Sequence, residues 1–109
     1  MRYCFGIDIG GTTIKCGLFT QDGTVVRKWE IPTNREAGGV KIPGELAASI
    51  SEVMGEEKIT QEDVIGVGMG VPGPVLADGM VLLCPNLGWD HINVRVMMEQ
   101  LLGVPVRVG

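Results

Sequence analysis

The stretch DIGGTTIK, residues Asp8–Lys15, decides the fold, because its two glycines interrupt an alternating apolar pattern. The apolar side chains that precede it occupy every second position: Tyr3, Phe5, Ile7 and Ile9. A period of two is typical of a β-strand, and Gly10-Gly11 supplies the break that ends one. The sequence therefore predicts a first strand that runs directly into a glycine turn.

The residues after this turn predict two further strands. An extended pattern resumes over Ile14–Phe19, and Gln21-Asp22-Gly23 supplies the residues of a hairpin turn. Thr24–Ile31 is rich in β-branched residues and ends at Pro32. The N-terminal part of the chain is thus predicted to be an antiparallel three-strand meander.

The apolar period changes from about Pro43 onward, where the spacing becomes that of an α-helix. The predicted buried stripe of this helix consists of Leu46, Ala47, Ile50, Val53 and Met54. The next segment, Val64–Val71, is a nearly unbroken run of small and apolar residues, which is typical of a parallel strand buried on both faces. Its glycines would let another element pack closely against it.

Three more elements are predicted toward the C-terminus. Val75–Leu83, split by Asp78-Gly79, has the pattern of a small hairpin. Asn93 is a typical helix N-cap residue, and Gly103 would end the helix that follows it. Val104–Val108 is then predicted to be a strand. The whole pattern is that of an α/β protein in which helices pack on a sheet.

Length and composition restrict the classes of function. The chain of 109 residues is predicted to be one domain, with 9 Lys and Arg against 13 Asp and Glu and a net charge of −4. Because no basic cluster is available for phosphate backbones, no nucleic-acid partner is expected. Cys4, Cys16 and Cys84 form no C-x-x-C pair, which favours a reduced, cytoplasmic protein. Neither a signal peptide nor a membrane-spanning segment is indicated.

The opening stretch also carries the first candidate site. A strand that ends in Gly10-Gly11-Thr12 exposes successive backbone N–H groups where no Cβ obstructs a ligand, and phosphate oxygens bind in such nests. The hydroxyls of Thr12 and Thr13 add donors. Asp8 could hold Mg²⁺ directly or through water, and Lys15 adds a positive charge. The spacing is neither the Walker nor the dinucleotide-binding pattern, so an ordinary hairpin turn is an equally good interpretation of these residues alone.

Two later stretches are further candidates. Gly66–Pro74 ends in the rigid corner Pro72-Gly73-Pro74, which could bring its backbone against a small ligand or simply form a tight turn. Pro85–Asp90 places the Asn86 amide beside the Trp89 indole, a pairing suited to sugar hydroxyls. A capped loop with a packed Trp is the simpler alternative. The single histidine, His91, is not expected to bind a metal ion, because it lacks a second imidazole or a cysteine nearby.

Taken together and in this order, three motifs resemble the N-terminal part of sugar kinases of the ROK family (repressor, open reading frame, kinase). These motifs are Asp8–Lys15, Gly70-x-Pro72-Gly73 and Pro85-Asn86-Leu87-Gly88-Trp89. The resemblance covers essentially the whole chain and is strongest to bacterial glucokinases. It implies the actin, Hsp70 and sugar-kinase superfold, whose ribonuclease-H-like lobe joins an antiparallel three-strand meander to parallel strands with flanking helices. The pattern of strands and helices predicted above agrees with that lobe.

The same resemblance implies a hexose kinase and gives roles to the candidate residues. Kinases of this family transfer the γ-phosphoryl group of ATP to a sugar hydroxyl, and the similarity to glucokinases points to glucose and glucose 6-phosphate. By resemblance, Asp8 would lie near Mg²⁺, with Lys15 as a neighbour. The residues expected at the ATP phosphates are Gly10, Gly11, Thr12 and Thr13. Gly73 and Asn86 would line the hexose site.

Members of this family also carry parts that residues 1–109 lack. An Asn-Asp pair follows the strand that matches Val104–Val108, and its Asp is the general base, so the base is expected just beyond Gly109. The adenosine pocket, a second phosphate loop and a His/Cys zinc site belong to the second half of such chains. Residues 1–109 are therefore expected to be the N-terminal nucleotide- and sugar-binding lobe of a longer kinase, inactive alone. Uncovered apolar faces would make this lobe self-associate.

Two other interpretations stay open. Sugar-responsive repressors of the family use the same lobe to sense a ligand and carry a helix-turn-helix in front of it. Because Met1 stands seven residues before Asp8, such a motif is not expected in this chain. The other interpretation is an α/β association domain whose Gly-Gly-Thr turn is purely structural. Titration with Mg-ATP and then with glucose would separate them, because only a phosphate site predicts changes confined to Gly10–Lys15.

Overall fold

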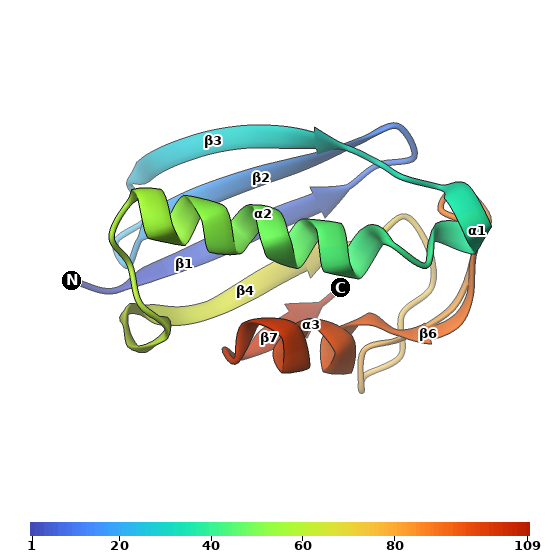
Figure 1. Cartoon of the computed structure of the whole chain (residues 1–109). Coiled ribbons are helices and arrows are strands. Elements are labelled where there is room, and N and C mark those ends of the chain that lie inside the picture. The colour runs from blue at the N-terminus through green and yellow to red at the C-terminus, as the bar shows by residue number, and fades with distance from the viewer.

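The central feature of the fold is a five-stranded sheet with the strand order β3-β2-β1-β4-β7 (Figure 1). The computed structural model describes every residue from Met1 to Gly109. Three consecutive strands pair antiparallel and confirm the predicted meander. They are β1 (Tyr3–Ile9), β2 (Thr13–Thr20) and β3 (Val25–Pro32).

The turn between β2 and β3 forms where the sequence predicted it. Gly23 takes a φ of 91°, which few other residues adopt without strain. The Asp22 carboxylate accepts hydrogen bonds from the Thr20 hydroxyl and the Thr24 N–H. These bonds lower the pKa of Asp22, because they favour the ionised carboxylate.

Two parallel strands extend the sheet on the other side of β1. Strand β4 (Val64–Gly70) pairs with β1, and β7 (Val106–Val108) pairs with β4. The C-terminal ends of these three strands therefore lie at one edge of the sheet, which is where open α/β sheets bind ligands. The antiparallel meander joined to parallel strands is the predicted ribonuclease-H-like arrangement.

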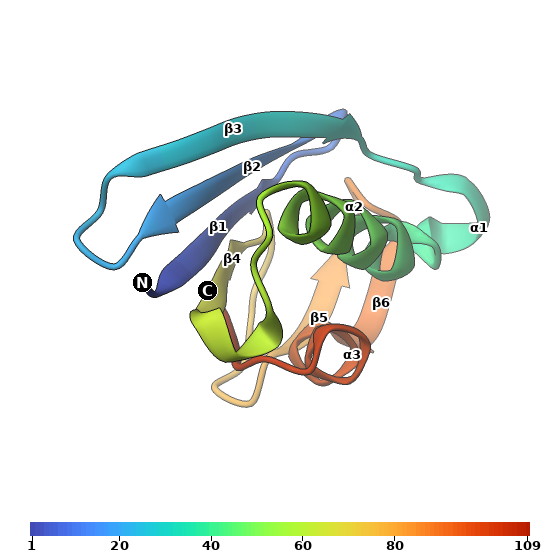
Figure 2. The same cartoon turned by 60° about the vertical axis from the view of Figure 1, so that its left-hand side comes forward.

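The two long helices, α2 (Ile42–Glu56) and α3 (Val94–Leu102), lie on the same side of the sheet (Figure 2). The predicted amphipathic stripe of α2 forms the middle of the core, where Leu46 and Ile50 are fully buried. Strand β3 reaches the same helix through its long side chains. Arg27 pairs with Glu56 at 2.8 Å, and the indole N–H of Trp29 donates to the Ser49 hydroxyl at 2.9 Å.

The opposite face of the sheet is covered by no other element, and this corrects the prediction that β4 is buried on both faces. Ile65 is 40% exposed, and Gly68 is exposed as well. A run of small and apolar residues looks the same whether or not its second face is covered, so the sequence alone could not distinguish the two cases.

The strand register aligns Gly17, Gly6 and Gly68 in one row on this open face. The Phe19 ring covers part of that row, since a Cβ on Gly17 would stand 2.7 Å from it.

A second, two-stranded sheet extends the hairpin predicted for Val75–Leu83. Strand β5 (Met80–Cys84) pairs antiparallel with β6 (Trp89–Asn93), and Val75 makes only an isolated bridge to Val81. The predicted hairpin around Asp78-Gly79 is confirmed in a short form, because the Leu76 N–H donates to the Met80 carbonyl at 2.9 Å and the Leu82 N–H donates to the Pro74 carbonyl at 3.4 Å. The longer pairing of β5 with β6 across the turn Pro85–Gly88 was not predicted.

The ends of α3 form as the sequence predicted. The Asn93 side chain accepts a hydrogen bond from the Val96 N–H at 3.1 Å, which caps the first turn. Gly103 ends the helix in a left-handed conformation with a φ of 69°. Both features confirm the predicted helix boundaries.

The remaining helical elements are short. They are α1 (Glu36–Gly39), which the sequence did not predict, and the 3₁₀ turn η1 (Gln61–Asp63). None of the helices combines the length and the apolar character that crossing a bilayer requires.

Candidate functional site

The turn from Gly10 to Thr13 joins β1 to β2 at the edge where the parallel strands end. The Gly10 N–H donates to the Thr13 carbonyl at 3.0 Å. Thr33, the residue after β3, stabilises the turn with two hydrogen bonds. Its hydroxyl donates to the Gly10 carbonyl at 2.7 Å, and its N–H donates to the Thr12 carbonyl at 2.9 Å. The N–H groups of Gly11 and Thr12 have no partner in the chain. Two adjacent donors are thus held in place and free to bind an anion, whereas the Gly10 donor is engaged.

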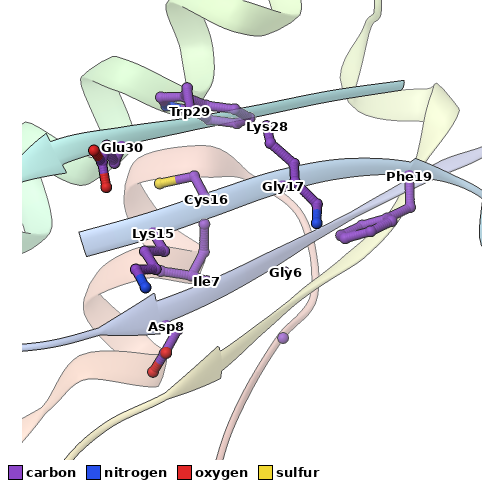
Figure 3. A pocket seen from close by; sticks show the side chains of 11 residues that line it. Gly6, Ile7, Asp8, Lys15, Cys16, Gly17, Phe19, Lys28, Trp29 and Glu30 are labelled. Atoms are coloured by element: carbon purple, nitrogen blue, oxygen red, sulfur yellow. The ribbon is translucent and has the colours of Figure 1, made fainter. Parts of the chain in front are cut away.

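Asp8 and Lys15 stand opposite each other on β1 and β2, on the open face of the sheet (Figure 3). Both side chains are exposed. Gly70, the partner of Asp8 on β4, leaves bare backbone on the other side, where a Cβ would stand 3.8 Å from the Asp8 Oδ1. A surface hollow of about 800 Å³ includes both charged side chains together with Gly17 and Lys28. An accessible carboxylate bordered by backbone is a suitable ligand for a hydrated Mg²⁺.

Asn86 lies against the glycine turn, although it stands far from it in the sequence. A Cβ on Gly11 would stand 3.6 Å from the Asn86 Cβ and 3.7 Å from its carbonyl oxygen. The Asn86 side chain is exposed, so its amide is available to a ligand beside the free N–H groups. The structure therefore brings the first and the third predicted stretches together.

Trp89 differs from the expectation that its indole would accompany Asn86 at a ligand. Its side chain is 2% exposed and belongs to the core. The indole N–H donates to the Gly39 carbonyl at 2.9 Å. Trp89 is thus the packed residue that the simpler alternative described, and Asn86 is the member of the pair that faces solvent.

The Pro72-Gly73-Pro74 corner follows β4 and packs on β5. A Cβ on Gly73 would stand 2.9 Å from the Leu83 carbonyl oxygen and 3.3 Å from the Cys84 Cβ. The Cys84 thiol donates to the Pro72 carbonyl at 3.6 Å. The close approach to β5 explains why a glycine stands at this corner, as in the tight-turn interpretation.

Thr33 also belongs to the site, because it holds the glycine turn in place. Thr33 was missed by sequence reasoning, although its place directly after β3, next to the Thr13–Pro32 pair in the strand register, is a signal that could have identified it.

Cys16 faces the core, where burial raises the pKa of its thiol to about 11. A thiol with so high a pKa is a poor nucleophile, so the chemistry of the site depends on the oxygen and nitrogen groups described above.

Comparison with known proteins gives consistent results. The family model described as the ROK family matches residues 4–109. The chain is 36% identical over 108 residues to a glucokinase from Halalkalibacterium halodurans, covering 98% of the chain and 33% of that protein. It is 32% identical over 104 residues to a putative xylose repressor from Caldicellulosiruptor sp., covering 94% of the chain and 26% of that protein.

A solved structure with the same fold is also available. The crystal structure of a ROK family glucokinase from Streptomyces griseus, in complex with glucose and AMPPNP, matches with a TM-score of 0.74 at 30% identity. The match covers 97% of this chain and 32% of that one. The chain thus spans about a third or less of the length of these proteins.

Proposed function

The chain belongs to the ROK family, and from this premise we propose that it is the N-terminal lobe of a longer ATP-dependent hexose kinase, with glucose as the sugar. The observation that carries the proposal is the juxtaposition of Gly11 and Asn86, which places two free backbone donors beside an exposed amide. The similarity to two glucokinases supports glucose as the substrate.

The groups that would bind the nucleotide all belong to the β1–β2 segment. The free N–H groups of Gly11 and Thr12 would bind phosphate oxygens, with the hydroxyls of Thr12 and Thr13 as further donors. Asp8 would hold Mg²⁺ through water or directly, and Lys15 would add positive charge beside it. When bound, the metal ion supplies neutralisation of the phosphate charge.

The groups that would bind the sugar come from the loops after β4 and β5. The Asn86 amide would exchange hydrogen bonds with sugar hydroxyls, and Gly73 would form part of the wall. The general base is proposed to follow β7, which ends beside β4 at the same edge of the sheet. Residues 1–109 alone are therefore expected to bind without catalysing transfer. The adenosine pocket and a zinc site are proposed for the rest of the longer chain.

The nucleotide site is tested by titrating isotope-labelled protein with Mg-AMPPNP and following amide chemical shifts. We expect shifts confined to Gly10–Lys15. We expect Asp8→Asn to weaken the binding of the nucleotide in the presence of Mg²⁺ by about tenfold, the size of one lost ionic contact. Asp22→Asn is the matched control, because Asp22 is an exposed carboxylate in the other hairpin turn of the meander. The absence of any shift at millimolar nucleotide would leave the purely structural turn as the correct interpretation.

The catalytic part of the proposal is tested on the longer protein. The reading frame past Gly109 would be sequenced first and the whole product assayed for ATP turnover with glucose, mannose, fructose and N-acetylated hexosamines. Turnover with one hexose, absent in the 109-residue chain, is the expected result. Sugar binding without phosphorylation by the whole protein would support the ligand-sensing alternative instead, as in a sugar-responsive repressor.

We further propose that the lobe is cytoplasmic and that it self-associates when isolated. The open face of the sheet supports self-association, because Ile65 and Val26 are 40% and 39% exposed with no element over them. Sedimentation at increasing concentration should show a rising average mass. A constant monomer mass would contradict this part of the proposal.

A further inference from the structure

The short segment α1 has an unusual backbone. Ala37, Gly38 and Gly39 are consecutive residues with φ values of 53°, 72° and 69°. Ala37 is a non-glycine residue in a conformation that L side chains rarely adopt. Because such a run does not persist without support from its surroundings, the contacts of α1 show what holds it in place.

The support comes from the Asn86 loop, against which α1 packs backbone to backbone. A Cβ on Gly39 would stand only 2.2 Å from the Leu87 carbonyl oxygen. A Cβ on Gly88 would stand 3.0 Å from the Gly38 Cα. A side chain at Gly39 or at Gly88 would collide with the facing backbone, so the two glycine segments fix each other's position.

One side chain fastens this contact. The Trp89 indole is 2% exposed and donates its N–H to the Gly39 carbonyl at 2.9 Å. Asn86 belongs to the turn that precedes Trp89. In this turn the Leu87 N–H donates to the Cys84 carbonyl at 3.0 Å, and the Gly88 N–H donates to the Pro85 carbonyl at 3.1 Å. The turn is therefore held on one side by α1 and Trp89, and on the other side it meets Gly11.

We propose that Trp89, acting through the Gly38-Gly39 backbone, is a positioning residue that holds the Asn86 amide beside the turn from Gly10 to Thr13. Trp89 is buried and would touch no substrate, whereas Asn86 is exposed and makes no hydrogen bond that would orient it. The inference rests on the proposed function only for the identity of the ligand. The positioning itself is a property of the chain without ligand and can be measured as such.

The first test compares the two tryptophans of the chain. Trp89→Phe keeps an aromatic ring in the core but removes the donor to Gly39. Trp29→Phe is the matched control, because it removes an equivalent indole donor, to the Ser49 hydroxyl at 2.9 Å. We expect Trp89→Phe, but not Trp29→Phe, to abolish the nuclear Overhauser effect between protons of Gly11 and Asn86. It should also speed amide exchange at Leu87 and Gly88 by about fivefold to tenfold, the effect of one lost hydrogen bond.

A second pair of variants keeps the test decisive if Trp89→Phe does not fold. Gly38→Ala adds a Cβ that would stand 3.4 Å from the Gly88 carbonyl oxygen. Gly23→Ala has the same kind of positive φ, at 91°, but meets nothing within 4 Å. Gly38→Ala should raise exchange at Gly88 and shift the Asn86 resonances, and Gly23→Ala should leave both unchanged.

The outcomes separate the positioning role from the proposed ligand. If neither Trp89→Phe nor Gly38→Ala changes the Asn86 loop, or if both controls change it equally, the positioning role is wrong whatever glucose does. The same samples are then titrated with glucose. If glucose shifts Asn86, Trp89→Phe should weaken its binding by about tenfold through lost orientation, and Trp29→Phe should not. If the loop responds as expected but glucose never shifts Asn86, the positioning role stands and the sugar role of Asn86 fails.

Discussion

Lys58, the second residue after the end of α2, has a φ of 58°, a backbone conformation that does not suit its side chain. This conformation lets the Ile59 N–H reach the Met54 carbonyl at 2.8 Å, which closes the helix. A non-glycine residue is destabilised there by about 1–2 kcal/mol, and glycine recovers part of that energy after its larger loss of chain entropy. We expect Lys58→Gly to raise the free energy of unfolding by about 0.5–1 kcal/mol, measured by urea denaturation.

Lys41 provides the matched control for this substitution. It precedes the same helix with a right-handed φ of −86°, so glycine relieves no strain there. Lys41→Gly should leave stability unchanged or lower it. An equal gain in both variants would show that the backbone angle is not the cause.

Cys16 makes stability depend on pH in the alkaline range. Burial raises the pKa of its thiol from 9.0 to about 11, so the folded protein holds this proton more tightly than the unfolded chain. The stabilisation is fully present below pH 9.0 and is lost as the pH rises through about 11. Urea denaturation between neutral pH and that range should therefore show a steeper loss for the wild type than for Cys16→Ala. Equal slopes for the two proteins would show that the buried thiol is not the source of this pH dependence.

Among the secondary-structure elements, α3 depends on one capping side chain. Asn93→Ala removes the acceptor for the Val96 N–H and should lower the free energy of unfolding by about 1 kcal/mol. Asn86→Ala is the comparison, because that side chain is exposed and should change stability by less than about 0.5 kcal/mol. Thermal melts of both proteins check the difference, and equal melting temperatures would argue against the cap as a source of stability.

Elements with a local signal were predictable from the sequence, and elements held by distant contacts were not. The alternation before Gly10, the helical stripe through Leu46 and the Asn93 cap are all encoded within a few residues. By contrast, α1 exists because its glycines meet Leu87 and Gly88, which no pattern within residues 36–39 indicates. The pairing of β5 with β6 was likewise not predicted, because the sequence analysis assigned β5 only to the hairpin around Asp78-Gly79.

The candidate site divides in the same way. The glycine turn and its two free donors follow from the local sequence around Gly10-Gly11. Gly11 and Asn86 are far apart in the sequence, so their contact could be found only from the fold. Thr33 fixes the turn from a third strand, and Trp89 took a structural place that its neighbourhood in the sequence did not reveal.

At the scale of the whole molecule, Glu99 connects three parts of the fold. Its carboxylate accepts a hydrogen bond from Arg95 at 2.7 Å and another from the Val106 N–H of β7 at 3.1 Å. Arg95 in turn donates to the Asp78 carbonyl at 2.7 Å, at the turn before β5. The helix α3 is thus fastened both to the edge of the main sheet and to the small sheet.

Glu99→Gln should lower the free energy of unfolding by about 1 kcal/mol, because the amide keeps one acceptor and loses the ionic contact at a partly exposed site. Amide exchange at Val106 should rise more than exchange within β1. Glu52→Gln, an exposed change on α2, should do neither. Uniform acceleration of exchange across the sheet would contradict a local connection to β7.

The strand order has a consequence for how the protein is made. Strand β1 lies at the centre of the sheet, and β2 can pair with it as soon as the first hairpin emerges, whereas β4 completes its other side only after residue 70. At about 5–20 residues per second, a ribosome needs roughly 3–12 seconds to extend the chain from Ile9, the end of β1, to Gly70, the end of β4. During this interval the edge of β1 that faces β4 in the folded protein stays unpaired, and it can pair with a second nascent chain as readily as with its own β4. Yield on expression should therefore depend on the rate of translation between the codons for Ile9 and Gly70, since slower synthesis there prolongs the exposure.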